Sequence, residues 1–340
     1  MAPTRVLVTR SDKLGDFMLT WPALALLRRA MPAAHIAVLV AEAAEPIARA
    51  CPVVDEVLVD QGQSVSELAA DIRKGGFDAA IALFSTWRIA MVLWRSGVRY
   101  RLAPATKLAQ VLFNHRVVQR RSRSIKPEHA YNVDVILRFL DDHQIPVPDA
   151  PRGPYLSFPA SARQAAADQL KDAYGIPEEA IRLVVHPGSG GSASTLPTAG
   201  FAGLVDRLTS GRPLFVIVTA GPGETAQAEA VRDQIRAHSA VVHVSRDGLV
   251  EFAKVLATAD MFVSGSTGPL HIAGAIDVPT VAFYPRRRSS TALRWQTTNE
   301  PRNRLAFSPP PAAGESEMTA IDLDAAAATV SQCFLGPHRG

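Results

Sequence analysis

The feature that most limits the fold of this 340-residue chain is an alternation of short apolar runs with stretches of helical periodicity. In the first half, the apolar runs fall at residues 6–9, 36–40, 57–59 and 78–84, and the helical stretches at residues 17–31, 42–50, 65–74 and 87–94. Strands separated by helices form right-handed βαβ units with a parallel sheet that helices cover on both faces. The pattern therefore predicts a Rossmann-like α/β domain.

A proline-rich segment at residues 144–154 interrupts this pattern. Proline lacks a backbone donor and disfavours helix, so this segment marks a domain boundary. Beyond it the alternation resumes, with strands expected at residues 183–185, 214–218, 241–244, 261–263 and 280–283. We predict two Rossmann-like domains with parallel sheets facing across a cleft, residues 1–150 and 151–318. An alanine-rich helix within residues 319–340 closes the chain and could pack back on the amino-terminal domain.

Composition is consistent with two globular cores, since 47% of residues are hydrophobic and 20% are charged. No apolar run is long enough to span a bilayer, and the amino terminus lacks the pattern of a signal peptide. We expect a cytoplasmic location. Cys51 and Cys333 are the only cysteines, so the sequence predicts neither a disulfide framework nor a metal-binding cluster.

Basic residues are concentrated in one stretch, residues 116–126, although the formal net charge is only +4. Such a stretch can face nucleic acid, an anionic membrane surface or a phosphorylated substrate. It lacks the interleaved aromatic residues of a nucleic-acid module, so we expect no nucleic-acid partner. A solvated basic loop is an equally good interpretation.

Three loops that follow predicted strands are candidates for ligand binding, because ligands of doubly wound sheets bind at the carboxyl ends of the strands. The first loop, residues 9–17, is neither a GxGxxG nor a P-loop motif. Asp16 in this loop could cap the following helix or act as a general base on an attacking hydroxyl. Spacing alone favours the cap.

The second loop, residues 186–194, is rich in glycine and serine, so backbone amides could form an anion-binding nest; a flexible surface loop is the alternative. In the third loop, residues 264–271, Ser266 or Thr267 can cap a helix whose free amides suit a diphosphate. His271 could donate to a phosphate, although a lone histidine is more often packed or on the surface. Glu224 follows another strand and could bind ribose hydroxyls; a solvent-facing side chain is its default interpretation.

Taken together, RVLVTRSDKLGD (residues 5–16), HPGSGG (186–191) and SGSTGPLHIA (264–273) resemble the signature stretches of the heptosyltransferase family, glycosyltransferase family 9. The resemblance covers nearly the whole chain. It implies a GT-B fold, with an ADP-heptose donor held by the carboxyl-terminal domain and a lipopolysaccharide inner-core acceptor held by the amino-terminal domain. It also implies an inverting transfer that needs no metal or other cofactor.

The resemblance also assigns roles to residues. Asp16 matches the catalytic carboxylate of the family, which reverses the preference for a cap. Donor contacts match Ser189, Gly190, Glu224, Thr267, Gly268 and His271. Amides, a helix dipole and hydroxyl donors would stabilise the charge that develops on the leaving diphosphate. From charge and position, we expect an acidic core acceptor to contact Arg88, Arg120, Arg121, Arg123 and Lys126.

Two donor-site positions depart from the family pattern. Many members carry a lysine where this chain has Ser194, and Ser266 replaces a frequent aspartate. The donor sugar could therefore differ, or a cation from residues 286–288 could compensate. A GT-B transferase or epimerase that uses a UDP-sugar and a non-catalytic nucleotide- or glycan-binding protein are the alternatives. A dehydrogenase is disfavoured, because neither half carries the glycine fingerprint.

Overall fold

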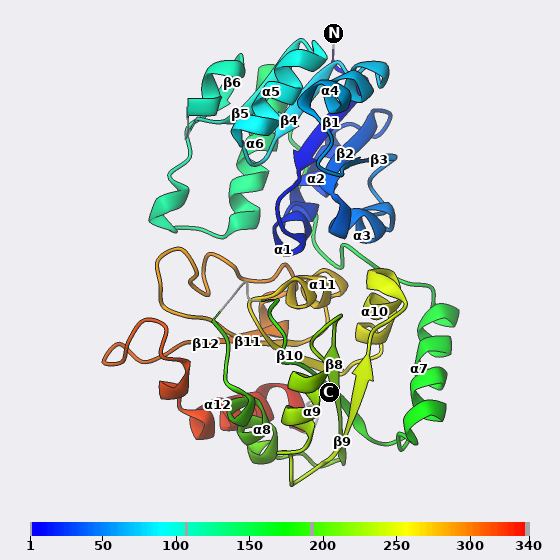
Figure 1. Cartoon of the computed structure of the whole chain (residues 1–340), viewed down its shortest axis with the longest axis vertical. Helices are drawn as coiled ribbons and strands as arrows, with labels where there is room; N and C mark the ends of the chain where they lie inside the picture. Colours follow the sequence, from blue (N-terminus) through cyan, green and yellow to red (C-terminus); the bar gives the residue numbers. More distant parts are fainter. Residues whose placement is uncertain (1, 106–107, 191–193, 337–340) are drawn as a thin grey trace. The chain divides into compact units, whose positions relative to one another are not determined.

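The computed structural model describes residues 2–105, 108–190 and 194–336. The chain forms two compact units, Met1–Tyr155 and Leu156–Gly340. Each unit is built on a six-stranded parallel sheet with helices on its faces (Figure 1), so the predicted α/β class is confirmed. The division lies a few residues beyond the boundary at residue 150 that the proline-rich segment suggested.

The sheet of the amino-terminal unit has the strand order β3-β2-β1-β4-β5-β6. Its strands are β1 (Arg5–Arg10), β2 (His35–Ala41), β3 (Glu56–Asp60), β4 (Ala79–Ala82), β5 (Tyr100–Pro104) and β6 (His115–Val117). In this Rossmann order the direction of winding reverses between β1 and β4. A crevice is expected outside the carboxyl ends of these two strands, where the first candidate loop begins.

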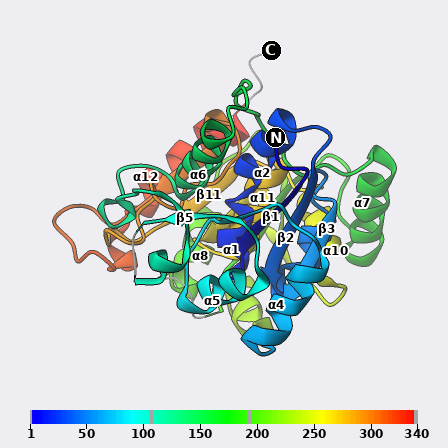
Figure 2. The ribbon, with the colours of Figure 1, turned by 90° about the horizontal axis from the view of Figure 1, so that it is seen from above.

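The helices of this unit are α1 (Leu14–Met18), α2 (Trp21–Ala30), α3 (Glu45–Arg49), α4 (Val65–Lys74), α5 (Trp87–Ser96) and α6 (Glu128–Asp142), with 3₁₀ turns η1 (Glu42–Ala44), η2 (Leu108–Leu112) and η3 (Arg121–Arg123). The bounds of α4 match the expected stretch, and a capping box between Ser64 and Glu67 fixes its start. The single helix expected over residues 17–31 is instead two helices, because Pro22 lacks an amide proton and starts a new helix. Helices α4 and α5 lie side by side (Figure 2).

The carboxyl-terminal unit repeats the same winding, with strand order β12-β11-β10-β7-β8-β9. Its strands are β7 (Ile181–His186), β8 (Leu214–Ala220), β9 (Ser239–Val244), β10 (Met261–Gly265), β11 (Thr280–Phe283) and β12 (Arg304–Phe307). Its helices are α7 (Ala160–Tyr174), α8 (Thr198–Arg207), α9 (Thr225–Arg232), α10 (Gly248–Leu256), α11 (Gly268–Ile276) and α12 (Leu323–Val330), with short turns η4 (Pro301–Asn303), η5 (Met318–Ala320) and η6 (Ser331–Leu335). Because β7 pairs with both β8 and β10, the loops after these three strands meet at one edge.

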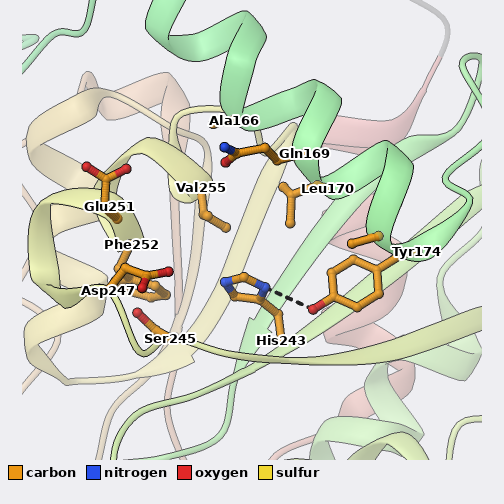
Figure 3. A pocket seen from close by; sticks show the side chains of 11 residues that line it. Ala166, Gln169, Leu170, Tyr174, His243, Ser245, Asp247, Glu251, Phe252 and Val255 are labelled. Atoms are coloured by element: carbon orange, nitrogen blue, oxygen red, sulfur yellow. Dashed lines mark hydrogen bonds between the residues drawn. The ribbon is translucent and has the colours of Figure 1, made fainter.

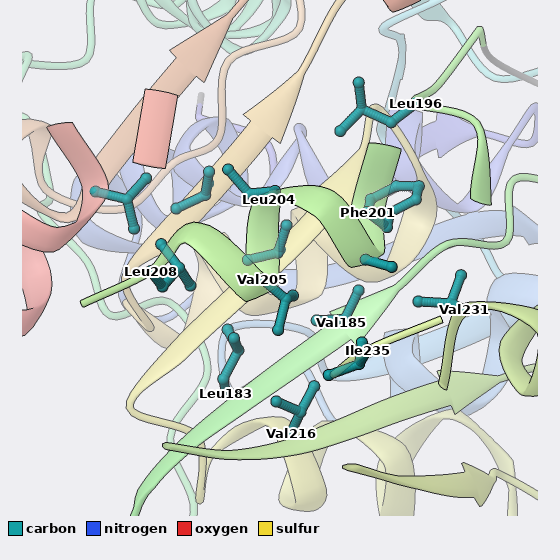
Figure 4. Packing of buried hydrophobic residues seen from close by; sticks show 14 of the residues in the cluster. Leu183, Val185, Leu196, Phe201, Leu204, Val205, Leu208, Val216, Val231 and Ile235 are labelled. Carbon is teal, nitrogen blue, oxygen red and sulfur yellow. The ribbon is translucent and has the colours of Figure 1, made fainter. Parts of the chain in front are cut away.

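The core of this unit fills the space between the sheet and helices α8, α9 and α12. Val185 and Val216 from the strands pack against the Phe201 and Val205 face of α8 (Figure 4). The closing helix α12 contributes Ala326, Ala327 and Val330 to the same core and packs on α8. The apolar face of α12 is therefore buried within the carboxyl-terminal unit.

None of the helices in the described ranges is long and apolar enough to cross a membrane.

Candidate functional site

A buried arginine lies at the centre of the first candidate loop. Arg10 is the last residue of β1, and its side chain is 2% exposed. Its guanidinium donates from Nε to Asp12 Oδ1 at 2.8 Å and from Nη2 to Asp16 Oδ1 at 2.5 Å. A third bond runs from Nη1 to Glu128 Oε1 at 3.2 Å. One cation at the strand end thus holds three carboxylates.

A second arginine shares Glu128, which begins α6 and is almost fully buried. Arg121 Nη1 donates to Glu128 Oε1 at 2.5 Å, and its Nη2 donates to the carbonyl of Leu83, just after β4, at 2.9 Å. Two arginines and three carboxylates therefore form a charge network at the carboxyl ends of β1 and β4, the switch point of the sheet.

Asp16 in this network has an altered acidity. Burial raises the pKa of its carboxyl to about 6, and Asp12 and Glu128 act in the same direction while Arg10 opposes them. The side chain is 13% exposed and bonds to Arg10, and no side chain caps the start of α1. A carboxylate with this pKa is ionised at neutral pH and is a stronger base than an ordinary aspartate.

The pKa of Arg10 moves in the direction that keeps the network charged. Burial lowers it, but the carboxylates of Asp12, Asp16 and Glu128 outweigh this effect and raise the pKa above its ordinary value. Arg10 therefore remains a cation throughout the physiological range.

The basic residues predicted to bind the acceptor separate into two groups. Arg88 bonds to Asp60 and the Gln63 carbonyl, and Lys126 pairs with Asp134. Together with Arg121 in the charge network, they have structural partners. Arg120 and Arg123 are exposed, and neither forms an ion pair within the described part of the chain.

In the carboxyl-terminal unit, Glu224 organises the second candidate loop. Its Oε1 accepts from the Gly190 amide and its Oε2 from the Gly221 amide, both at 3.1 Å. A Cβ at Gly188 would lie 2.3 Å from this carboxylate, so a larger residue there would displace the Glu224 side chain. Glu224 is thus not the solvent-facing residue of the default interpretation, because it joins the loops after β7 and β8.

His186, the last residue of β7, lies beneath this loop. Its Nδ1 is 3.0 Å from Thr219 Oγ1, and its Nε2 is 3.6 Å from Glu224. Burial lowers the pKa of His186, although Glu224 opposes the shift, so the ring is neutral at physiological pH. The groups beneath the loop are therefore the neutral His186 ring, the Thr219 hydroxyl and one carboxylate, that of Glu224.

The third loop leads into α11, whose N-cap is Thr267. Thr267 Oγ1 bonds with Ser264 Oγ at 3.1 Å and does not cap the helix. The first-turn amides are therefore left without a side-chain cap, as an anion site at a helix start requires. Ser266 and Gly268 are half-buried at this start, while His271 in the first turn is buried.

The predicted donor residues of the second loop lie at the same edge. Ser189 is half-buried, and Gly190 and Ser194 are exposed. The rest of the loop, residues 191–193, falls outside the described residues. The Arg286 guanidinium, one proposed replacement for a missing lysine, donates to the carbonyls of Pro311 and Ala313.

Sequence reasoning missed Thr195 as a site residue. Its hydroxyl lies 2.5 Å from where a Cβ on Gly265 would stand, so it packs directly on the backbone of the third loop. The Oγ1 atom is buried and has no hydrogen-bond partner among the described residues. Such a donor is costly to leave unsatisfied, which makes it available to a ligand at this edge. Arg10 and Glu128 were also missed as site residues, since only the fold brings them together.

A pocket of about 200 Å³ lies elsewhere on this unit, between α7, β9 and α10 (Figure 3). Tyr174 OH and His243 Nδ1 bond across it at 3.1 Å, and none of the predicted donor residues lines it. No group of three or more His, Cys, Asp or Glu side chains with metal-holding geometry occurs within residues 2–105, 108–190 and 194–336. Metal independence stays a prediction.

The sequence of this chain is similar to those of known glycosyltransferases. Residues 65–304 match the family described as "Glycosyltransferase family 9 (heptosyltransferase)". A Haemophilus influenzae protein named "Putative glycosyltransferase" is 40% identical over 333 residues, which cover 96% of each chain.

Two solved structures have the same fold. A family 9 glycosyltransferase from Veillonella parvula superposes with a TM-score of 0.80 at 18% identity, over 98% of this chain and 97% of that one. The Escherichia coli ADP-heptose lps heptosyltransferase II superposes with a TM-score of 0.77 at 16% identity, over 97% of this chain and 98% of that one. The resemblance read from the three sequence stretches is thereby confirmed.

Two Rossmann-like units of this topology, matched over nearly their full length by such structures, define the GT-B fold. The chain belongs to glycosyltransferase family 9, the heptosyltransferase family.

Proposed function

We propose that this enzyme transfers heptose from ADP-heptose to a lipopolysaccharide inner-core acceptor, with inversion at the anomeric carbon and without a metal. The observation that carries the proposal is Asp16, a carboxylate at the switch point of the amino-terminal sheet with a pKa of about 6. A general base needs a pKa near the working pH and a fixed position, and the bond to Arg10 supplies the position.

In the proposed reaction, an acceptor hydroxyl donates its proton to the Asp16 carboxylate as its oxygen attacks the anomeric carbon of the donor. The bond between that carbon and the diphosphate oxygen breaks, and its electron pair leaves with ADP. Attack from the face opposite the leaving group inverts the configuration. Arg10 holds Asp16 in place and favours its ionised form.

The proposed donor site is the edge where the loops after β7, β8 and β10 meet. Backbone amides near Ser189 and Gly190, together with the uncapped start of α11 at Thr267 and Gly268, would bind the diphosphate. His271 and the Thr195 hydroxyl would add donors there. Preorganised donors of this kind stabilise the negative charge that develops on ADP as the bond breaks. In this proposal they take the place of a metal ion.

ADP-heptose is the proposed donor because the solved Escherichia coli relative is named for it and shares the fold. Glu224 is the proposed ribose contact, although two backbone amides already occupy its carboxylate oxygens. Ser194 and Ser266 leave this site with fewer charges than the family pattern implies. The alternatives are a UDP-sugar donor and a non-catalytic binding role.

On the acceptor side, Arg120 and Arg123 are the basic residues open to a phosphorylated core sugar, while Arg88, Arg121 and Lys126 position neighbouring groups. We propose that the enzyme works in the cytoplasm, in peripheral contact with the inner membrane that holds its acceptor.

A transfer assay tests the proposal. It measures transfer from ADP-heptose to purified heptose-deficient core lipid by the wild type and by Asp16→Ala, with ADP binding measured in parallel. We expect the wild type to transfer, and the variant to bind ADP normally but lose most transfer. If the wild type transfers sugar only from a UDP-sugar, the donor is a UDP-sugar and not ADP-heptose. ADP binding without transfer from any nucleotide sugar would support the non-catalytic role and overturn the proposal.

A further inference from the structure

Exposed apolar side chains gather in one part of the amino-terminal unit. All but two of the large hydrophobic residues that are exposed in the described chain fall within residues 87–125, and they are between 51% and 85% exposed. They are Trp87, Trp94, Leu108, Val111, Val118 and Ile125. Scattered apolar residues on a surface are ordinary, but a concentration of this kind marks an interaction site.

Helix α5 shows that this exposure is not the edge of the core. Its Ile89, Val92 and Leu93 are buried in the amino-terminal unit, where they pack with α4 and the sheet. Trp87 and Trp94 lie seven residues apart, so they project from the same side of the helix, away from that buried face. The helix is therefore apolar on both sides, and its outer side lacks a covering partner among the described residues.

The same part of the chain is strongly and uniformly basic. Residues 79–127 hold ten of the 36 Lys and Arg residues and none of the 32 Asp and Glu residues. Arg95, Arg99 and Arg116 are exposed and form no ion pair with any residue that the structure describes, and Arg95 donates to the Ser66 hydroxyl. Positive charge is thus left without counter-charge beside the exposed apolar residues.

The fold places these residues along one border of the unit. Strand β6 is the edge strand of the sheet, and η2, which carries Leu108 and Val111, packs against α5 (Figure 1). Val118 and Ile125 follow β6 on the way to α6. We call this border, formed by α5, η2, β6 and residues 118–125, the β6-edge surface.

We propose that the β6-edge surface docks on an anionic lipid bilayer. Tryptophan and aliphatic side chains enter the boundary between headgroups and acyl chains, while arginines pair with lipid phosphates. A second copy of this chain fits less well, because a two-fold contact would bring the same unpaired arginines face to face. The inference rests on the proposed contact with the inner membrane and names the surface that makes it; it does not depend on the donor or on Asp16.

Co-sedimentation of the full chain with vesicles tests the proposal. One set of vesicles contains phosphatidylethanolamine and phosphatidylglycerol, and the other contains phosphatidylcholine alone. The charge variant is Arg95→Glu with Arg99→Glu and Arg116→Glu, and the apolar variant is Trp94→Ser with Leu108→Ser and Val111→Ser. The matched control, Arg163→Glu with Arg236→Glu and Arg302→Glu, reverses three exposed arginines of the carboxyl-terminal unit.

We expect the wild type to bind the anionic vesicles, more weakly at high salt, and to ignore phosphatidylcholine. Each surface arginine contributes roughly fivefold to binding at an anionic bilayer, so the charge variant should bind at least tenfold more weakly than the control. The apolar variant should lose binding while its circular dichroism stays native. The proposal is overturned if the control loses as much binding as the charge variant, or if the wild type does not bind vesicles. It is also overturned if the wild type is a dimer that does not bind vesicles and that dissociates in the apolar variant.

Discussion

The loops at the carboxyl ends of the strands differ in composition between the two units of this enzyme. In the amino-terminal unit, charged side chains dominate, with Arg10 and Arg121 paired to Asp12, Asp16 and Glu128. In the carboxyl-terminal unit, glycines and backbone amides dominate, and one carboxylate, Glu224, holds them. Proton transfer needs a titratable group in an altered environment, whereas a diphosphate needs many fixed donors. The contrast predicts that proton transfer and nucleotide binding can be damaged separately.

The largest separation is expected for Asp16→Asn. Loss of a general base lowers transfer by about 10²- to 10⁴-fold, while ADP affinity should stay unchanged because the amide is nearly the same size. Initial rates of ADP release and calorimetric titration with ADP measure the two effects. Asp12→Asn is the matched control, since Asp12 also bonds to Arg10 but is more exposed, and it should retain transfer within about tenfold. Equal losses in both variants would refute a special role for Asp16.

Glu128→Gln should give the next largest effect, on stability. The change removes the buried carboxylate that pairs with Arg121 and one of the three that pair with Arg10, and we expect the free energy of unfolding to fall by about 3 kcal/mol. Denaturant unfolding monitored on the amino-terminal unit measures the change. Glu45→Gln, which removes one partner of an exposed helical pair with Arg49, should cost under about 1 kcal/mol. If the two variants are equally stable, the network does not support this unit.

Gly188→Ala should damage nucleotide binding and leave the charge network intact. The added Cβ would stand 2.3 Å from the Glu224 carboxylate, so this side chain must shift and its bond to the Gly190 amide is lost. A shift of one hydrogen-bonding group costs about 1.4 kcal/mol or more, which corresponds to roughly tenfold weaker ADP binding. Gly211→Ala, where a Cβ meets no atom within 4 Å, is the control. Unchanged ADP affinity in Gly188→Ala would remove this loop from the donor site.

The smallest effect is expected for Thr195→Val. The Thr195 hydroxyl is buried without a partner among the described residues, so its removal should not lower stability. If the hydroxyl binds donor phosphate, ADP affinity falls by about three- to tenfold, the equivalent of one hydrogen bond. Thr298→Val, which deletes another buried hydroxyl that lacks a partner in the described ranges, should leave ADP affinity unchanged. A fall in both variants, or in neither, would assign Thr195 no donor contact.

Much of the fold could be predicted because periodicity reports it directly. The central strands are continuous apolar runs, and the carboxyl-terminal sheet repeats the winding of the first. Strands β5, β6 and β12 were missed because they are short and each contains an arginine, which shortens its apolar run. The break between α1 and α2 was missed because Pro22 fits a helix start as well as a kink.

The site was only partly predictable. The loops at the strand ends follow from the topology rule, and the family resemblance singled out Asp16. The pKa of Asp16 depends on Glu128, whose bond to Arg10 spans 118 positions of sequence. Spacing cannot reveal such a contact, and the same holds for Thr195 against Gly265. Residues that act through distant partners therefore had to come from the structure.

The central claim is that Asp16 in the charge network acts as the base for sugar transfer, and the pH dependence of kcat/KM tests it most directly. A base must be ionised, so activity should fall as the pH drops through the folded-state pKa of about 6 and level off above it. In Glu128→Gln, loss of a neighbouring negative charge should move this midpoint to lower pH. A midpoint near the ordinary aspartate pKa of 3.8, or one that Glu128→Gln does not move, would contradict the account.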